Sequence, residues 1–302
     1  MILITGSEGL VGRATIRALA DRGISCRQFD IARDPGQDTR NERSLEAAVE
    51  GVDGVLHLAA VSRVVWAQRD PKLAQEVNVA ATQKLVDTVI RQKTRPWMIF
   101  ASSREVYGEQ GSLPVHEDAE LSPMNIYARS KVAGEQMVAA AREAGVVSNI
   151  VRLSNVYGCT RDHADRVVTA FAHTAALGGE LRLDGPENMF DFTHVDDVAR
   201  GLVALIEATQ TGKILPPIHL LTGRGTTLQM LADLAGRVAR KPVSARNAPS
   251  RTYDVARFYG DPSRAKELLG WQAEVDIETG FARLADNFFE EAEAKTSSLA
   301  LA

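Results

Sequence analysis

Short apolar runs alternate with longer amphipathic stretches through the first half of the chain. The apolar runs predict strands, at Ile2–Thr5, Ser25–Asp30, Val55–Ala59, Trp97–Ala101 and Val147–Leu153. The stretches between them carry apolar residues at helical spacing and predict helices, at Leu10–Arg22, Ser44–Val49, Pro71–Arg91 and Asn125–Ala144. This alternation is typical of a parallel sheet covered by helices on both faces.

Beyond about residue 155 the rhythm loosens. Glycine and proline clusters divide the chain into shorter pieces, at Gly178-Gly179, Asp184-Gly185-Pro186, Pro216-Pro217 and Gly223–Gly225. The segment Phe190–Ala208 again has the pattern of a strand or turn leading into a capped helix, so we expect residues 189–216 to return to the first domain. The sequence therefore predicts an α/β fold, with a doubly wound parallel sheet (Rossmann type) over residues 1–155 and a smaller C-terminal α+β domain within 156–302 that supplies a substrate pocket.

Composition narrows the class of protein. The chain has 302 residues, of which 45% are hydrophobic and 25% charged, and its formal net charge of −4 indicates neither a nucleic-acid partner nor an anionic membrane surface. No apolar run reaches the roughly 18 residues that span a bilayer. With only two cysteines and a first strand that starts at the N-terminus, we expect a cytoplasmic protein, and the six scattered histidines suggest no metal site.

A glycine-rich turn joins the first predicted strand to the first predicted helix. In Gly6-x-x-Gly9-x-x-Gly12, glycines permit a tight turn and let backbone N–H groups approach a pyrophosphate at the helix N-terminus. Asp30 ends the second strand, 18 residues after Gly12, where a carboxylate accepts hydrogen bonds from ribose hydroxyls and repels a 2′-phosphate. The pattern favours NAD over NADP, although Arg33 could accommodate a 2′-phosphate, and a tight turn without ligand remains the alternative.

Two residues suited to proton transfer share one face of the Asn125–Ala144 helix. Tyr127 and Lys131 are four positions apart. Because a tyrosine hydroxyl has an ordinary pKa of about 10, we expect the Lys131 ammonium and a bound nicotinamide to lower it. Ser102 and Ser103 follow the Trp97–Ala101 strand, and a hydroxyl there points into the ligand crevice of a parallel sheet. Ser103 could bond the reacting oxygen, or merely cap the turn.

The order of these motifs resembles that of extended short-chain dehydrogenases, and in particular the NAD-dependent sugar epimerase/dehydratase group. The resemblance runs from Met1 to about Trp271. It rests on Gly6–Gly12, His57-Leu58-Ala59-Ala60, Asn78-Val79, Ser103-x-Glu105-Val106-Tyr107-Gly108, Tyr127–Lys131 and Arg152-x-x-Asn155-Val156-Tyr157-Gly158.

The resemblance implies a Rossmann domain that holds NAD and a C-terminal domain for a nucleotide sugar, in a homodimer. It implies that Tyr127 is the acid/base, that Lys131 holds the nicotinamide ribose, that Asp38 contacts the adenine, and that Asn78 supports an active-site water and the helix geometry. The cofactor-binding set so implied is Gly6, Gly9, Leu10, Val11, Gly12, Asp30, Asp38, Leu58, Ala59, Ala60, Asn78, Ala101, Ser102, Tyr127 and Lys131.

The same resemblance implies a substrate side. Asn155 matches a contact to the substrate's phosphate, Arg251 a pyrophosphate ligand and Asp254 a ribose ligand, with Ser103 and Arg104 also at the substrate. The chain departs from the family pattern at Phe190, which stands where a second pyrophosphate-binding arginine is usual.

Glu105 occupies a place where dehydratases and decarboxylases of the group carry a working glutamate, so we count it with Ser103, Tyr127 and Lys131 as catalytic. A plain polar contact is the alternative for Glu105. Arg104 replaces the aspartate that dehydratases use as general acid, which argues against that reaction.

Three functions follow as hypotheses. The first is an NAD-dependent nucleotide-sugar epimerase that transiently oxidises a sugar hydroxyl, at the 4-position, and reduces it again. The second is a nucleotide-sugar decarboxylase or a sugar dehydrogenase/reductase. The third is a regulatory protein that binds NAD without turnover, against which the intact Ser103, Tyr127 and Lys131 argue.

Overall fold

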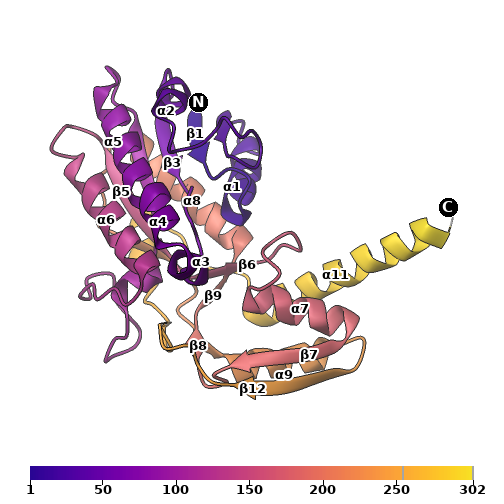
Figure 1. Cartoon of the computed structure of the whole chain (residues 1–302). Coiled ribbons are helices and arrows are strands. Elements are labelled where there is room, and N and C mark those ends of the chain that lie inside the picture. Colours follow the sequence, from indigo (N-terminus) through magenta and orange to yellow (C-terminus); the bar gives the residue numbers. More distant parts are fainter. Residues whose placement is uncertain (254, 301–302) are drawn as a thin grey trace.

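A six-stranded parallel sheet forms the centre of the first domain (Figure 1). The computed structural model describes residues 1–253 and 255–300. The strand order is β10-β5-β4-β3-β1-β2, and every neighbouring pair is parallel. The strands are β1 (Ile2–Thr5), β2 (Cys26–Phe29), β3 (Gly54–His57), β4 (Trp97–Ser103), β5 (Ser148–Leu153) and β10 (Ile218–Leu220).

Helices cover both faces of this sheet, which confirms the predicted doubly wound α/β fold. One face packs on α1 (Leu10–Ala20), α8 (Val195–Gln210) and α10 (Ser263–Leu269). The other packs on α2 (Glu42–Val49), α5 (Ala81–Arg91) and α6 (Ile126–Ala140). The strands were readable from sequence because central parallel strands are apolar on both faces, and all four residues of β1 and of β3 are buried.

The predicted helix over 71–91 is not one regular helix. It consists of α4 (Pro71–Ala74), a π-helical segment η1 (Gln75–Ala80) and α5, preceded by a short helix α3 (Val64–Arg69) that the sequence pattern did not indicate. A π-turn inserts one residue and rotates the helix face, and such turns are frequent at functional sites. Asn78 lies in this segment.

A second region lies below the carboxyl ends of the sheet strands in Figure 1. Its core gathers around Phe171, Leu231 and Phe281. Its larger elements are α7 (Val167–Leu177), β7 (Gly179–Asp184), α9 (Leu228–Val238), β12 (Val243–Ala248) and α11 (Ile277–Ala300). The short strands are β6 (Asn155–Tyr157), β8 (Met189–Phe190), β9 (Phe192–His194) and β11 (Thr226–Thr227), with a 3-10 turn η2 (Arg104–Tyr107) after β4.

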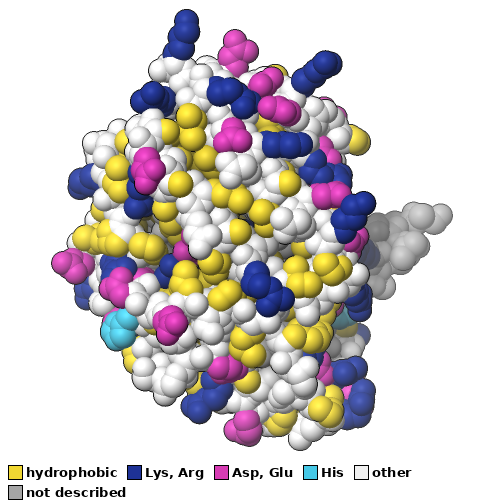
Figure 2. Space-filling model, turned by 60° about the vertical axis from the view of Figure 1, so that its left-hand side comes forward, with side chains coloured by type: hydrophobic (Ala, Val, Ile, Leu, Met, Phe, Trp, Pro, Cys, Tyr) yellow, Lys and Arg dark blue, Asp and Glu magenta, His cyan; other side chains and the backbone are white. Residues whose placement is uncertain are grey.

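The chain crosses between the two regions several times. After β9 it enters α8, which packs against α1, and β10 then adds an edge strand beside β5. Basic and acidic side chains lie interspersed on the face drawn in Figure 2, in keeping with the small net charge. Of the helices in the described ranges, none combines the length and apolar character needed to cross a bilayer.

Candidate active site

A cleft of about 1050 Å³ separates the carboxyl ends of the sheet strands from the second region. Its lining runs from the glycine turn after β1, past the ends of β3 and β4 and the face of α6, to β7, β8 and the 251 segment. Small-molecule sites usually measure roughly 300–1,000 Å³, so this cleft lies at the large end of that range. Open α/β sheets bind ligands at this edge.

The glycine turn leaves the N-terminus of α1 accessible from the cleft. Gly6 has φ of +69°, and a Cβ there would lie 2.7 Å from the Ala59 nitrogen; a Cβ on Gly12 would lie 2.4 Å from the Gly6 carbonyl oxygen. Gly9 is the N-cap residue of α1, and no side chain caps this end of the helix. A Cβ on Gly9 would lie 3.3 Å from the Gly6 carbonyl oxygen. Uncapped N–H groups in the first turn, with the helix dipole, fit a phosphate anion.

At the end of β2, Asp30 also lines the cleft. Its two oxygens accept hydrogen bonds from the backbone N–H groups of Glu8 and Ala32, each at 2.9 Å, which fixes the carboxylate beside the glycine turn. Arg33 donates instead to Gln28 at 3.0 Å and lies 3.7 Å from Glu8. The structure therefore presents Asp30, rather than Arg33, at the predicted ribose position.

Farther along this wall, Asp38 is committed to an ion pair with Arg40 at 2.7 Å, and this hydrogen-bonded partner lowers the pKa of Asp38. Both side chains line the cleft.

The ends of β3 and β4 form the floor. The expected residues Leu10, Val11, Leu58, Ala59, Ala60, Ala101 and Ser102 all line the cleft. Ser102 carries a buried hydroxyl with no hydrogen-bond partner in the described part of the chain. Since buried polar groups are nearly always paired, this hydroxyl, together with the open helix N-terminus, fits a bound dinucleotide.

Asn78 supports the start of α6, in line with the role in helix geometry that the resemblance implies, but it is not part of the cleft lining. It lies behind the cleft wall, 2% exposed. Its side chain accepts from the Val61 N–H at 2.7 Å and donates to the Ser130 hydroxyl at 3.0 Å, and Ser130 donates to the Tyr127 carbonyl at 2.7 Å. Asn78 therefore ties the loop after β3 to the first turn of α6 and positions Tyr127, without direct access to a cofactor.

Ser103, Tyr127 and Lys131 converge on the cleft, as the sequence suggested. The Ser103 hydroxyl hydrogen-bonds the Tyr127 phenol. Lys131 donates to the Ala101 carbonyl at 2.8 Å, and its Nζ lies 5.8 Å from the centre of the Tyr127 ring.

The expected effect of Lys131 on Tyr127 is wrong for the chain without ligands. Burial is the main cause that raises the pKa of Tyr127 to about 12; the Glu105 charge acts in the same direction, and Ser103, Arg166 and Arg104 oppose it. Burial also lowers the pKa of Lys131 to about 8. Removal from water disfavours the charged form of each group, so the phenol stays protonated at neutral pH.

Glu105 is held beside this pair. Its carboxylate accepts from Arg104 at 2.8 Å and from the Asn125 amide at 3.0 Å, and Asn125 is the N-cap of α6. Glu105 therefore lines the cleft and also supports the start of α6, which is the polar-contact role given above as the alternative.

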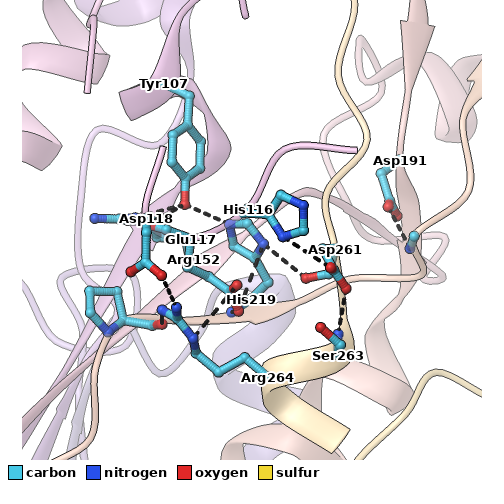
Figure 3. A network of polar contacts seen from close by, with 12 residues as sticks. Tyr107, His116, Glu117, Asp118, Arg152, Asp191, His219, Asp261, Ser263 and Arg264 are labelled. Carbon is cyan, nitrogen blue, oxygen red and sulfur yellow. Dashed lines mark hydrogen bonds and ion pairs between the residues drawn. The ribbon is translucent and has the colours of Figure 1, made fainter. Parts of the chain in front are cut away.

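A buried polar network supports η2 from behind (Figure 3). The Tyr107 hydroxyl lies 2.6 Å from Arg152 and 2.7 Å from His219, and Arg152 bonds Glu135 through two nitrogens at 2.8 and 2.7 Å. Burial lowers the pKa of His219 to about 3, so the ring stays neutral. Glu117 accepts from the His219 N–H at 3.1 Å and joins this network to the segment after η2. The network lies outside the cleft lining and supports η2 through the Tyr107 hydroxyl.

The second region supplies the opposite wall. Asn155, Phe190 and Arg251 line the cleft as expected, and Arg251 donates to Asp184 at 3.1 Å. The predicted ribose ligand Asp254 lies outside the described residues.

Sequence reasoning missed a bridge across the cleft mouth. Trp66 meets the His163 ring edge-on at 4.6 Å, and Arg63 pairs with Asp165 at 2.5 Å. Arg166 comes directly after Asp165 in the sequence, and its positive charge lowers the pKa of Tyr127. The charged run around Asp165 was the available signal, but nothing in the sequence indicated which segment it would face.

Comparisons with known proteins agree with this geometry. A model of the NAD-dependent epimerase/dehydratase family matches residues 2–216. UDP-glucose 4-epimerase from Caenorhabditis elegans is 26% identical over 329 residues, covering 92% of this chain and 94% of the relative.

Solved structures give the same picture. UDP-glucose 4-epimerase from Thermotoga maritima, crystallised with UDP-glucose, is 26% identical with a TM-score of 0.86 and covers 96% of this chain and 99% of its own. UDP-glucose 4-epimerase from Thermus thermophilus, in complex with NAD, is 25% identical with a TM-score of 0.85. The match covers 95% of this chain and 98% of the Thermus chain. The similarity extends over almost the whole of each chain.

Proposed function

The chain belongs to the NAD-dependent epimerase/dehydratase family, and from that premise we propose that it is a nucleotide-sugar 4-epimerase. The family makes it an NAD-dependent enzyme of the extended short-chain dehydrogenase type. One observation carries the proposal: Ser103, Tyr127 and Lys131 converge in a cleft that has an open helix N-terminus at one end and Arg251 on the opposite wall. In this proposal residues 1–155, with α8 and β10, hold the cofactor, and the second region holds the nucleotide.

Tyr127 handles the proton of the sugar hydroxyl. A bound NAD, held by the glycine turn and Asp30, would supply reversible hydride transfer at the carbon that bears this hydroxyl. Ser103 bonds the phenol and orients it toward the reacting oxygen, and Lys131, fixed on the Ala101 carbonyl, places a positive charge beneath the ring. Because burial keeps the pKa of Tyr127 at about 12, proton removal needs positive charge nearby, which Arg104 and Arg166 supply in part.

Binding of the nucleotide rests on Arg251 and Asn155. A guanidinium fork suits the oxygens of a diphosphate. Arg251 lines the cleft on this wall and donates to Asp184 at 3.1 Å. UDP is the first nucleotide to test, since the relatives named above are UDP-glucose 4-epimerases.

Incubation of the purified enzyme with a panel of nucleotide sugars, followed by mass spectrometry and NMR, tests the proposal. We expect an isomer of unchanged mass, with no net consumption of NAD, and no isomer from Tyr127→Phe. Absence of an isomer across the panel, with folded and NAD-loaded protein, would refute it.

A second candidate function is decarboxylation of a nucleotide sugar, or its net oxidation. Glu105 favours it, because a buried carboxylate stands beside Ser103 and acts on Tyr127. The same assay separates these outcomes: loss of carbon dioxide indicates decarboxylation, and accumulation of NADH indicates a dehydrogenase.

A further inference from the structure

Arg104 is a buried arginine in the wall of the cleft. Its side chain is 7% exposed, and its guanidinium carbon lies 4.9 Å from the centre of the Phe190 ring and 5.5 Å from that of Phe258. One terminal nitrogen, Nη2, pairs with Glu105 at 2.8 Å. The other, Nη1, is buried and has no hydrogen-bond partner within residues 1–253 and 255–300.

An unpaired donor on a buried cation is costly, because the rings exclude water from it and nothing replaces that water. Arg152 shows how this fold satisfies a structural arginine. Its Nε and Nη2 bond Glu135, and its Nη1 bonds the Tyr107 hydroxyl at 2.6 Å and the Glu117 carbonyl at 2.7 Å. Arg104 is similarly buried, at 6% against 4% of the whole residue exposed, yet its Nη1 has no partner among the described residues, and Arg104 lines the cleft.

The position of Arg104 assigns that ligand group to the reacting end of the cleft. Arg104 directly follows Ser103, and its charge is felt at the Tyr127 phenol. Arg251, the diphosphate candidate, lies on the other wall beside Asp184 of β7. Its closeness to Ser103 and Tyr127 favours a group on the sugar over the diphosphate as the partner of Arg104.

Local charge favours an anion there. Arg104 and Arg166 both act on Tyr127 as positive charges, Glu105 acts as a negative one, and Lys131 is a further cation near the phenol ring. Arg166 is paired with Asp162 at 3.3 Å, which leaves Arg104 and Lys131 as the cations closest to the reacting end. A planar guanidinium with a free N–H edge, stacked on aromatic rings, recognises a carboxylate through charge-assisted hydrogen bonds.

We propose that Nη1 of Arg104 binds a carboxylate carried by the sugar, so that the substrate is a nucleotide-linked uronic acid and Arg104 determines this specificity. The inference rests on the proposed function, because it assumes a nucleotide sugar in this cleft.

Calorimetry on the NAD-loaded enzyme tests it with three probes: UDP, UDP-glucose and UDP-glucuronic acid. We expect the wild type to bind UDP-glucuronic acid more tightly than UDP-glucose. Arg104→Met keeps the apolar stem on Phe190 and Phe258 and removes the charge, and it should weaken binding of UDP-glucuronic acid by about ten- to a hundred-fold, the range of a charge-assisted hydrogen bond. Its binding of UDP and UDP-glucose should stay unchanged.

Two further variants separate recognition from support of the fold. Glu105→Gln removes the competing negative charge and should tighten, or at least preserve, binding of UDP-glucuronic acid; a purely structural ion pair would make both variants weaker. Arg240→Met is the matched control, because Arg240 also stacks on a phenylalanine (Phe289, 4.1 Å) and pairs with a carboxylate (Asp286, 2.6 Å) but lies outside the cleft. If Arg104→Met does not fold, Arg104→Lys retains the charge without the fork and should show a smaller loss of the same selectivity.

Equal weakening of all three probes would place Arg104 on the diphosphate and overturn the inference, as would a wild type that binds UDP-glucuronic acid no more tightly than UDP-glucose. Failure of the proposed function is distinct. It appears as selective, Arg104-dependent binding of the uronic acid without formation of an isomer.

Discussion

Burial of the Lys131 ammonium destabilises the folded chain, and the pH dependence of the free energy of unfolding measures this effect. Lys131 is 4% exposed, and burial lowers its pKa from 10.5 to about 8. Between those pH values the unfolded chain keeps the proton and the folded chain releases it, so this residue makes the free energy of unfolding rise with pH. Over the whole gap the penalty amounts to about 3 kcal/mol, at ~1.4 kcal/mol per pH unit.

Only part of that penalty disappears over the pH range in which unfolding is conveniently measured. Between pH 7 and pH 9 the folded chain loses most of the Lys131 proton, and we expect a gain of about 1 kcal/mol in the free energy of unfolding. Lys131→Met has no titrating group at this position. The free energy of unfolding of the wild type, minus that of the variant, should therefore increase by about 1 kcal/mol between pH 7 and pH 9. Any constant cost of the lost hydrogen bond to the Ala101 carbonyl cancels from this difference.

Urea unfolding of NAD-free protein at several pH values provides the measurement. Lys72→Met is the control, because the Lys72 side chain is 89% exposed and has nearly the same surroundings in both states, so its difference from wild type should stay constant. A difference for Lys131→Met that is equally flat from pH 7 to pH 9 would refute the argument from burial.

Three further predictions concern the site. Tyr127→Phe should retain NAD affinity, measured by cofactor titration, and lose roughly 10²–10⁴-fold in turnover, since positioned acid/base groups supply that much; near-normal turnover on the natural substrate would remove Tyr127 from the reaction. Asp30→Ser should reduce the preference for NAD over NADP, because the carboxylate that repels a 2′-phosphate is gone; unchanged selectivity in parallel titrations would contradict this. Gly12→Ala should weaken NAD binding and lower thermal stability, because its Cβ would lie 2.4 Å from the Gly6 carbonyl oxygen, whereas Gly236→Ala, with open space around it, should do neither; comparable melting temperatures and NAD affinities for the two variants would show that the turn can adjust.

The sequence by itself determined the central sheet and most of the cofactor side. Strands buried on both faces need continuous apolar runs, and such runs are visible without any knowledge of their neighbours. The glycine turn and the four-residue spacing of Tyr127 and Lys131 are likewise local, because a turn or a helix face depends only on nearby residues. The structure brings Ser103 to the same cleft, as expected from its place at the end of a parallel strand.

Tertiary structure alone decided the electrostatics of the site. The pKa of Tyr127 rises because surrounding segments exclude water from the phenol, and no spacing within α6 reveals that exclusion. Asn78 moves behind the cleft wall because the π-turn of η1 rotates it toward Ser130. The free donor of Arg104 depends on Phe190 and Phe258, which come from distant parts of the chain. Burial and charge are properties of everything that packs around a group, so they become known only when the whole fold is known.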